Sequence, residues 1–255
     1  MDGIGKFSAH FSGFEESYIV IGGAACEDHI QAQGLTFRVT KDIDMILIVE
    51  GLSSEFFARF WEFIWAGKYE RSEKDEGGRK YYRFKRPMEA GFPQMIELFS
   101  RVPESIEEST LIQFTPIPTE ENLSSLSAIL MDEEYYRFTI DHSEVGNGNF
   151  RRAGVLALIC LKIKAFLNLT ASKLSGEKVD SSKIKKHKLD VFRLTATLTE
   201  EDNIELPEGI RNDLFLFLDQ MVEEGPNVKP VMKSMGVSGL TLENVINQLR
   251  MSFQL

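Results

Sequence analysis

The chain has 255 residues, of which 43% are hydrophobic and 27% are charged, a composition that is typical of a globular protein and excludes a disordered one. Its 29 Lys and Arg against 39 Asp and Glu leave a formal net charge of -10. Binding to duplex nucleic acid by bulk charge needs a basic surface, so we expect no duplex DNA partner. The net charge does not exclude a local basic groove on the surface.

The sequence predicts a cytoplasmic protein. Its two cysteines, Cys26 and Cys160, lie inside apolar runs and match no zinc or disulfide spacing, so we expect buried thiols in a reducing compartment. The N-terminal MDGIGKFSAHF lacks the apolar region of a signal peptide. The uncharged stretches at 18–26 and 153–161 are shorter than the roughly 20 residues of a membrane span, so no membrane partner is expected.

The pattern of apolar residues predicts an α+β chain, with a mixed α/β sheet domain at 1–150 and an all-helical domain at 151–255. Short apolar or alternating runs predict strands at 18–21, 43–49, 80–86, 94–100, 110–117 and 135–140. Two helices are predicted between them, at 24–33 and from Ser53 or Ser54 to Gly67. The second is rich in aromatic residues and is expected to lie in the core, with a dimer face as the alternative.

The part of the chain after residue 150 has helical periodicity. A loop rich in Gly and Asn at 142–150 precedes it. The apolar spacing then predicts helices at 152–169, 182–198, 207–224 and 241–253. This second domain is therefore expected to contain no strand.

The most informative stretch runs from residue 18 to residue 49. Here an apolar strand leads into Gly22-Gly23 and then into a helix. Such a turn lets the backbone approach a phosphate and aims helix N-terminal amides at its charge. The alternative is an ordinary tight turn, since the Rossmann and P-loop spacings are both absent.

Acidic residues on two predicted strands favour the phosphate interpretation. Asp42 and Asp44 open the strand at 43–49, and because strand side chains alternate, both point to the same face while Ile43 points to the core. Two like charges about 7 Å apart at Cα are a poor structural choice, but they suit metal ions and a triphosphate. Glu97 interrupts a third apolar strand, where a buried carboxylate needs a partner.

These residues resemble the nucleotidyltransferase superfamily, which has the DNA-polymerase-β-like fold. The segments IGGAAC and FRVTKDIDMIL are most similar to the group around the AbiE-type toxins of type IV toxin-antitoxin systems and related uncharacterised bacterial transferases, in which Arg-x-Thr/Ser-x-Asp-x-Asp recurs. LKIKAF at 161–166 resembles the Lys-x-x-Ala helix of that group, and KKHKLDVFRL at 185–194 resembles its Lys-Asp/His-x-x-Asp helix. The resemblance spans about residues 18 to 198.

The resemblance implies a role for each matching residue. Gly22, Gly23 and Thr40 would bind the nucleotide, and Asp42, Asp44 and Glu97 would bind Mg²⁺ or Mn²⁺, Glu97 either as a ligand or as the general base. Lys162 would contact the phosphates of the NTP, and Asp190 would orient this lysine or the base. Two departures from the family are a long interval between Gly23 and Asp42 and a Glu in place of the commoner third Asp.

Structural alternatives exist for the two residues of the helical domain. Lys162 lies in the middle of an apolar stripe, so it must either extend its ammonium to solvent or meet an anion. Asp190 flanks another stripe, and its alternative is an ordinary ion pair with Lys186 or Arg193 on a solvated helix face.

Two basic segments permit an RNA partner. The run of Lys183, Lys185, Lys186, His187 and Lys188 fits an RNA backbone, but a solvated helix face explains it better. The strand at 80–86 carries four cations and two tyrosines, which suit single-stranded RNA. An edge strand protected by charge explains this strand nearly as well.

The function that the resemblance implies is transfer of a nucleoside monophosphate from an NTP to an acceptor hydroxyl. The acceptor would be an RNA end, tRNA included, a protein side chain or a small molecule, and a toxin of this kind would have a cognate antitoxin as partner. The alternative is a non-catalytic nucleotide-binding member of the same fold that acts through a partner protein. A plain interaction module leaves three acids on predicted strands unexplained.

Overall fold

The computed structural model describes residues 3–76, 79–99, 129 and 132–255 of the chain. It divides into two compact units. The sheet unit consists of Met1–Asp28, Arg38–Leu123 and Ser143–Ala153, and the helical unit consists of His29–Phe37, Ser124–His142 and Gly154–Leu255. The predicted fold class, a mixed sheet part followed by a helical part, is confirmed. The strand predicted at 110–117 lies outside the described residues.

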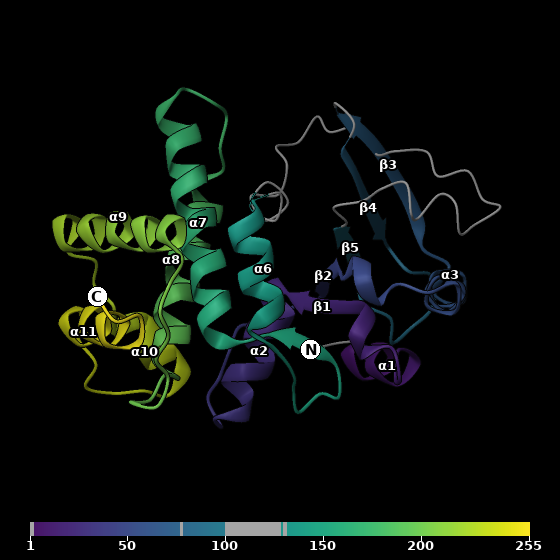
Figure 1. The fold of residues 1–255 in the computed structure, drawn as a ribbon, viewed down its shortest axis with the longest axis horizontal. Helices are drawn as coiled ribbons and strands as arrows, with labels where there is room; N and C mark the ends of the chain where they lie inside the picture. The colour runs from purple at the N-terminus through teal and green to yellow at the C-terminus, as the bar shows by residue number, and fades with distance from the viewer. Residues whose placement is uncertain (1–2, 77–78, 100–128, 130–131) are drawn as a thin grey trace. The chain divides into compact units, whose positions relative to one another are not determined.

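The sheet unit is built on a seven-stranded mixed sheet with the strand order β3-β4-β5-β2-β1-β7-β6, of which Figure 1 labels β1 to β5. Its strands are β1 (Tyr18–Ile21), β2 (Asp42–Leu47), β3 (Glu70–Glu76), β4 (Arg79–Lys85), β5 (Met95–Phe99), β6 (Ser143–Val145) and β7 (Arg151–Ala153). β2 is antiparallel to β1 and parallel to β5. All four residues of β1 are buried, which explains their continuous apolar run.

The charged strand predicted at 80–86 does not lie at an edge of the sheet. The alternative explanation of its charges, as protection of an edge strand, is therefore wrong. β4 is antiparallel to β3 on one side and to β5 on the other. The edge belongs to β3, whose sequence ERSEKDE contains no apolar residue and was therefore not predicted as a strand. A charged edge strand resists pairing with other chains.

Aromatic side chains form the core between the N-terminus and the sheet. The short helix α1 (Ile4–His10) is followed by Phe11, and α3 (Ser54–Gly67) supplies Phe56 and Phe63. The rings of Phe7 and Phe11 contact Tyr18 of β1 and Phe63 of α3, and Phe11 also contacts Phe56. The prediction that the aromatic helix belongs to the core is confirmed for its buried residues Phe56, Phe57, Phe60, Trp61, Phe63 and Ile64, but not for Trp65, which is 53% exposed.

The helical unit is built around two long helices. Its helices are α6 (Glu133–Asp141), α7 (Val155–Leu174), α8 (Ser181–Thr195), α9 (Glu208–Glu224), α10 (Lys229–Met235) and α11 (Leu242–Ser252). α7 packs against α6, α8 and α9, while α8 also packs against α10 and α11. The four helices predicted after residue 150 are confirmed, whereas the short α10 was missed. α2 (Gly22–Ala32) begins in the sheet unit and ends in the helical unit.

The prediction of a strand at 135–140 is wrong, because this segment lies in α6. Asp132 caps the helix by accepting hydrogen bonds from the backbone N–H groups of Glu134 (2.9 Å) and Tyr135 (3.4 Å). The buried residues are Tyr135, Tyr136, Phe138 and Thr139, which fit one face of a helix as well as a strand. A short apolar run does not distinguish the two, and the cap decides for the helix.

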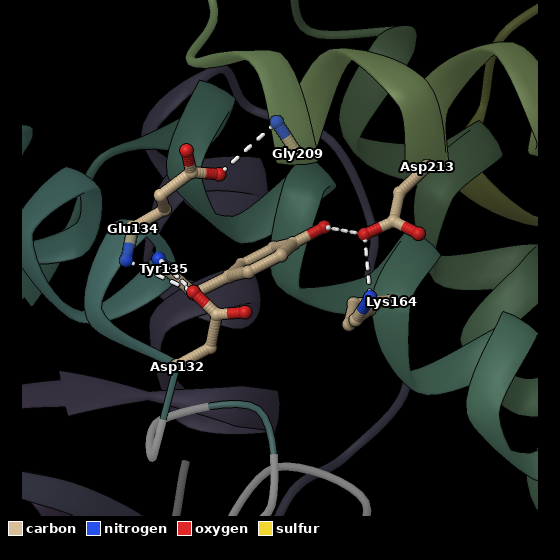
Figure 2. A network of polar contacts seen from close by, with 6 residues as sticks. All are labelled: Asp132, Glu134, Tyr135, Lys164, Gly209 and Asp213. Atoms are coloured by element: carbon tan, nitrogen blue, oxygen red, sulfur yellow. Dashed lines mark hydrogen bonds and ion pairs between the residues drawn. The ribbon is translucent and has the colours of Figure 1, made fainter.

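Three polar side chains link α6, α7 and α9 within the helical unit (Figure 2). The Tyr135 hydroxyl donates to Oδ2 of Asp213 at 2.9 Å, and Nζ of Lys164 donates to the same oxygen at 2.7 Å. Beside them, a carboxylate oxygen of Glu134 accepts from the backbone N–H of Gly209 at 3.1 Å, in the first turn of α9. The charged partner therefore stabilises a tyrosine hydroxyl that would otherwise be buried without a hydrogen bond.

Both cysteines are buried, as predicted, and no disulfide joins them. Burial raises the pKa of the Cys160 thiol well above its ordinary value, so this thiol stays protonated. In the described residues, α7 is the helix with the length and hydropathy of a membrane span, but 56% of its apolar window is buried inside the protein. That burial is typical of a core helix.

Candidate functional site

The turn between β1 and α2 requires a glycine for two reasons. Gly22 has a φ of 69°, in the left-handed region that L side chains rarely adopt. A Cβ at this position would also overlap Oδ2 of Asp44, so the carboxylate of Asp44 lies against the Gly22 backbone. The first predicted nucleotide-binding residue and a predicted metal ligand are therefore in contact.

Arg38 and Thr40 lie beside the second glycine of the turn. A Cβ at Gly23 would lie 2.7 Å from Cγ2 of Thr40 and 3.4 Å from Nη2 of Arg38. The backbone N–H of Thr40 donates to Oε2 of Glu27 at 3.3 Å, and its hydroxyl donates to the same oxygen. Thr40 thus turns its methyl group toward Gly23 and its hydroxyl toward α2.

Asp42 and Asp44 lie on the less buried face of β2. Both are half-buried, whereas the alternating residues Ile43 and Met45 are fully buried. Asp44 pairs in register with Ile21 of β1 on one side and with Glu97 of β5 on the other. Directly paired residues share a face of the sheet, so Glu97 lies on the same face as the two aspartates.

Glu97 has the charged partner that its buried position requires, and this partner is the half-buried Arg83. The two residues pair in register across β4 and β5. Nε and Nη2 of Arg83 both contact Oε1 of Glu97. Arg83, Glu97 and Asp44 therefore form a row across three neighbouring strands, with the Gly22 turn at its end.

The carboxylates at the turn and on the sheet face differ in how well they suit a metal ion. No group of three or more His, Cys, Asp or Glu side chains in the described residues is arranged to hold one. Mg²⁺ is commonly held by one or two carboxylates together with water and substrate phosphates. The pair of Asp42 and Asp44 beside the turn therefore fits such an ion, while the carboxylate of Glu97 is occupied by Arg83.

The two residues predicted in the helical unit pair with each other. Nζ of Lys162 lies 3.5 Å from Oδ2 of Asp190, and Nη1 of Arg193 lies 3.0 Å from the other oxygen. The side chains of Lys162 and Asp190 are 2% and 0% exposed. Lys162 therefore does not extend to solvent but meets an anion, and Asp190 forms its ion pair in the core of the unit rather than on a solvated face.

Two arginines had no individual role in the sequence prediction: Arg38, which lies beside Gly23, and Arg83, which pairs with Glu97. Arg38 belongs to the Arg-x-Thr motif, so its place in that motif was an available signal. The pairing of Arg83 with Glu97 depends on strand register, for which the sequence carries no local signal. Of the basic run in α8, Lys183, Lys185 and Lys186 are exposed and His187 is buried, while Lys188 pairs with Glu224.

No family model matches the chain, and no curated protein matches it significantly. Among solved structures, it is similar to the crystal structure of an antigenic nucleotidyltransferase-like protein from Paracoccidioides brasiliensis. The two share 13% sequence identity with a TM-score of 0.43, over 91% of this chain and 93% of that one.

Proposed function

We propose that the protein is a metal-dependent nucleotidyltransferase, which moves a nucleoside monophosphate from an NTP to an acceptor hydroxyl. The observation that carries the proposal is the contact between the Gly22 turn and the carboxylate of Asp44, with Asp42 on the same strand face. Nucleotidyl transfer needs these features together, because backbone amides bind the triphosphate and carboxylates bind the cation that accompanies it.

The triphosphate would bind at the start of α2. Gly22 and Gly23 carry no Cβ, so the backbone can approach a phosphate, and the first amides of α2 favour its negative charge. The guanidinium of Arg38, which lies beside Gly23, adds a charged donor of the kind that binds phosphate well. Thr40 would support this turn through Glu27 rather than by its own hydroxyl.

Asp42 and Asp44 would hold Mg²⁺ or Mn²⁺. When bound, such an ion offsets the charge that develops on the phosphate oxygens during transfer. In the reaction, the acceptor oxygen forms a bond to the α-phosphorus while the bond to the bridging oxygen breaks, so that pyrophosphate leaves and the hydroxyl proton passes to a base. The roles of Glu97 as a metal ligand or as this base stay predictions.

The contribution of the helical unit also stays a prediction. Lys162 would need to leave Asp190 to contact a phosphate, or else share its ammonium between the two anions. The proposed acceptors are an RNA end, tRNA included, a protein side chain or a small molecule. A toxin role with a cognate antitoxin belongs to the same proposal and rests on the sequence resemblance alone.

The test is a transfer assay with each of the four α-labelled NTPs, Mg²⁺ or Mn²⁺, and either total RNA or a cell lysate. We expect one class of macromolecule to carry the label with the wild-type protein and none with Asp44→Asn. NTP binding without any transfer would instead support the non-catalytic alternative. If the protein neither bound an NTP nor transferred label, the proposed function would be wrong.

A further inference from the structure

The ion pair of Arg83 and Glu97 lies on the acidic face of the sheet, and its geometry bears on what Glu97 does. Register pairs Arg83 with Glu97, and Glu97 with Asp44. This face therefore carries three carboxylates and one guanidinium within a few strand positions. Arg83 offsets part of the repulsion among the acids.

Arg83 holds the carboxylate of Glu97 through two donors. Its Nε and Nη2 both contact Oε1, and charge-assisted contacts of this kind are among the strongest hydrogen bonds in proteins. A cation approaching the same carboxylate would meet the positive guanidinium already bound there. This agrees with the absence of any three-residue ligand group among the described residues.

Arg83 is also the member of the pair that is accessible to a ligand. Its side chain is 29% exposed, against 11% for that of Glu97. Within the described part of the chain, the contacts of Arg83 use Nε and Nη2, which leaves the Nη1 donors for another partner. The planar fork of a guanidinium matches the geometry of a phosphate.

We propose that Glu97 is a positioning residue, which holds Arg83 on the acidic face so that its guanidinium contacts a phosphate of the bound NTP. Asp42 and Asp44 then supply the protein's metal ligands by themselves. This inference rests on the proposed nucleotidyltransferase function. It assigns Glu97 to the substrate side of the site rather than to the metal.

The experiment measures metal affinity and nucleotide affinity separately. Mn²⁺ binding is followed by electron paramagnetic resonance, and binding of a non-hydrolysable α,β-methylene NTP is followed by calorimetry in Mg²⁺. The variants are Arg83→Met, Arg83→Lys and Glu97→Gln, with Asp44→Asn as the metal-site reference. Arg86→Met is the matched control, because Arg86 lies just beyond the same strand in an exposed pair with Glu70.

We expect Arg83→Met and Glu97→Gln to keep Mn²⁺ affinity within about twofold and to lose NTP affinity by about tenfold to hundredfold, the range for a charge-assisted contact. Arg83→Lys should restore part of this loss, which a purely structural pair would not predict. The double variant Arg83→Met with Glu97→Gln should lose no more than Arg83→Met alone. Asp44→Asn should lose Mn²⁺ binding.

Three outcomes contradict the inference. Loss of Mn²⁺ binding in Glu97→Gln, to the extent seen in Asp44→Asn, would make Glu97 a metal ligand. If Arg83→Met and Arg86→Met bound the NTP with equal affinity, Arg83 would not contact a phosphate, while the proposed function would still hold. If the wild-type protein bound neither Mn²⁺ nor the NTP, both the inference and the proposed function would be wrong. Thermal unfolding of each variant without ligands shows whether it is folded. If Arg83→Met does not fold, its place in the comparison is taken by Arg83→Lys.

Discussion

The carboxylate of Asp44 lies against the backbone of Gly22, where any side chain would overlap it. The glycine is therefore required both by its positive φ and by the acid on the neighbouring strand. This contact joins the strand-to-helix turn to the acidic face of the sheet, and it makes the two features one site.

Gly22→Ala should damage the site more than its backbone strain alone predicts. Gly34 is a matched control, because its φ of 71° is nearly equal to that of Gly22 but a Cβ there would meet nothing within 4 Å. We expect Gly34→Ala to cost about 1 kcal/mol of unfolding free energy. Gly22→Ala should cost more and should also weaken Mn²⁺ binding by displacing Asp44. If Gly22→Ala and Gly34→Ala had equal effects on the unfolding free energy and on Mn²⁺ binding, the contact between Gly22 and Asp44 would have no role in metal binding.

Asp42→Asn and Asp44→Asn should each abolish nucleotide transfer while leaving the apo protein as stable as the wild type or slightly more stable. Removing one member of a like-charged pair relieves repulsion when no cation is bound. The measurement is thermal unfolding with and without Mn²⁺, because a ligand that binds the folded state raises the melting temperature. The wild type should gain stability from Mn²⁺ and the variants should not. Retention of near wild-type transfer in Mg²⁺ by either variant would overturn the metal assignment.

Lys162→Met should destabilise the helical unit. From the sequence alone an apolar replacement in an apolar stripe is expected to be tolerated, but the buried partner Asp190 reverses this expectation. Removing one member of a buried pair leaves an uncompensated charge and costs roughly 3 kcal/mol, and the remaining contact with Arg193 moderates the loss. Denaturant unfolding measures it, with the double variant Lys162→Met, Asp190→Leu as the control that should recover part of the stability.

The same variant tests whether the helical unit contributes to nucleotide binding. If Lys162 contacts a phosphate, Lys162→Met should lower NTP affinity by about tenfold to hundredfold beyond any fraction lost to unfolding. Titration at a temperature where both proteins are fully folded separates the two effects. Equal affinities would restrict Lys162 to its structural pair with Asp190.

Stability should fall steeply above about pH 10. Burial raises the pKa values of Tyr18, Tyr69 and Tyr135 above the ordinary value of 10.0, and at Tyr135 the charge of Asp213 adds to the effect. These phenols ionise in the unfolded chain before they ionise in the folded one. Their contribution is therefore fully present below pH 10 and is lost as the pH rises.

Tyr135→Phe should make this alkaline loss of stability less steep. At neutral pH it removes one hydrogen bond to Asp213 and should cost about 1 kcal/mol, since Lys164 still pairs with that carboxylate. Urea unfolding at pH 7 and pH 10.5 measures both effects. An unchanged slope of stability against pH would show that the Tyr135 hydroxyl titrates alike in the folded and unfolded states.

Local patterns in the sequence determined most helices, several strands and the shared face of Asp42 and Asp44. Helical spacing and strand alternation are properties of neighbouring residues, so α3, α7, α8, α9 and α11 could be predicted without the fold. The same reasoning showed that Glu97 needs a partner, because a carboxylate in an apolar strand is costly wherever the strand lies.

The tertiary structure decided which partner each charged residue has. Arg83 reaches Glu97 across 14 residues of sequence through strand register, and Lys162 reaches Asp190 through the packing of α7 on α8. β3 is a strand because β4 pairs with it, and α6 is a helix because Asp132 caps it. Register, packing and the choice between helix and strand for a short run depend on contacts distant in sequence, which residue periodicity does not encode.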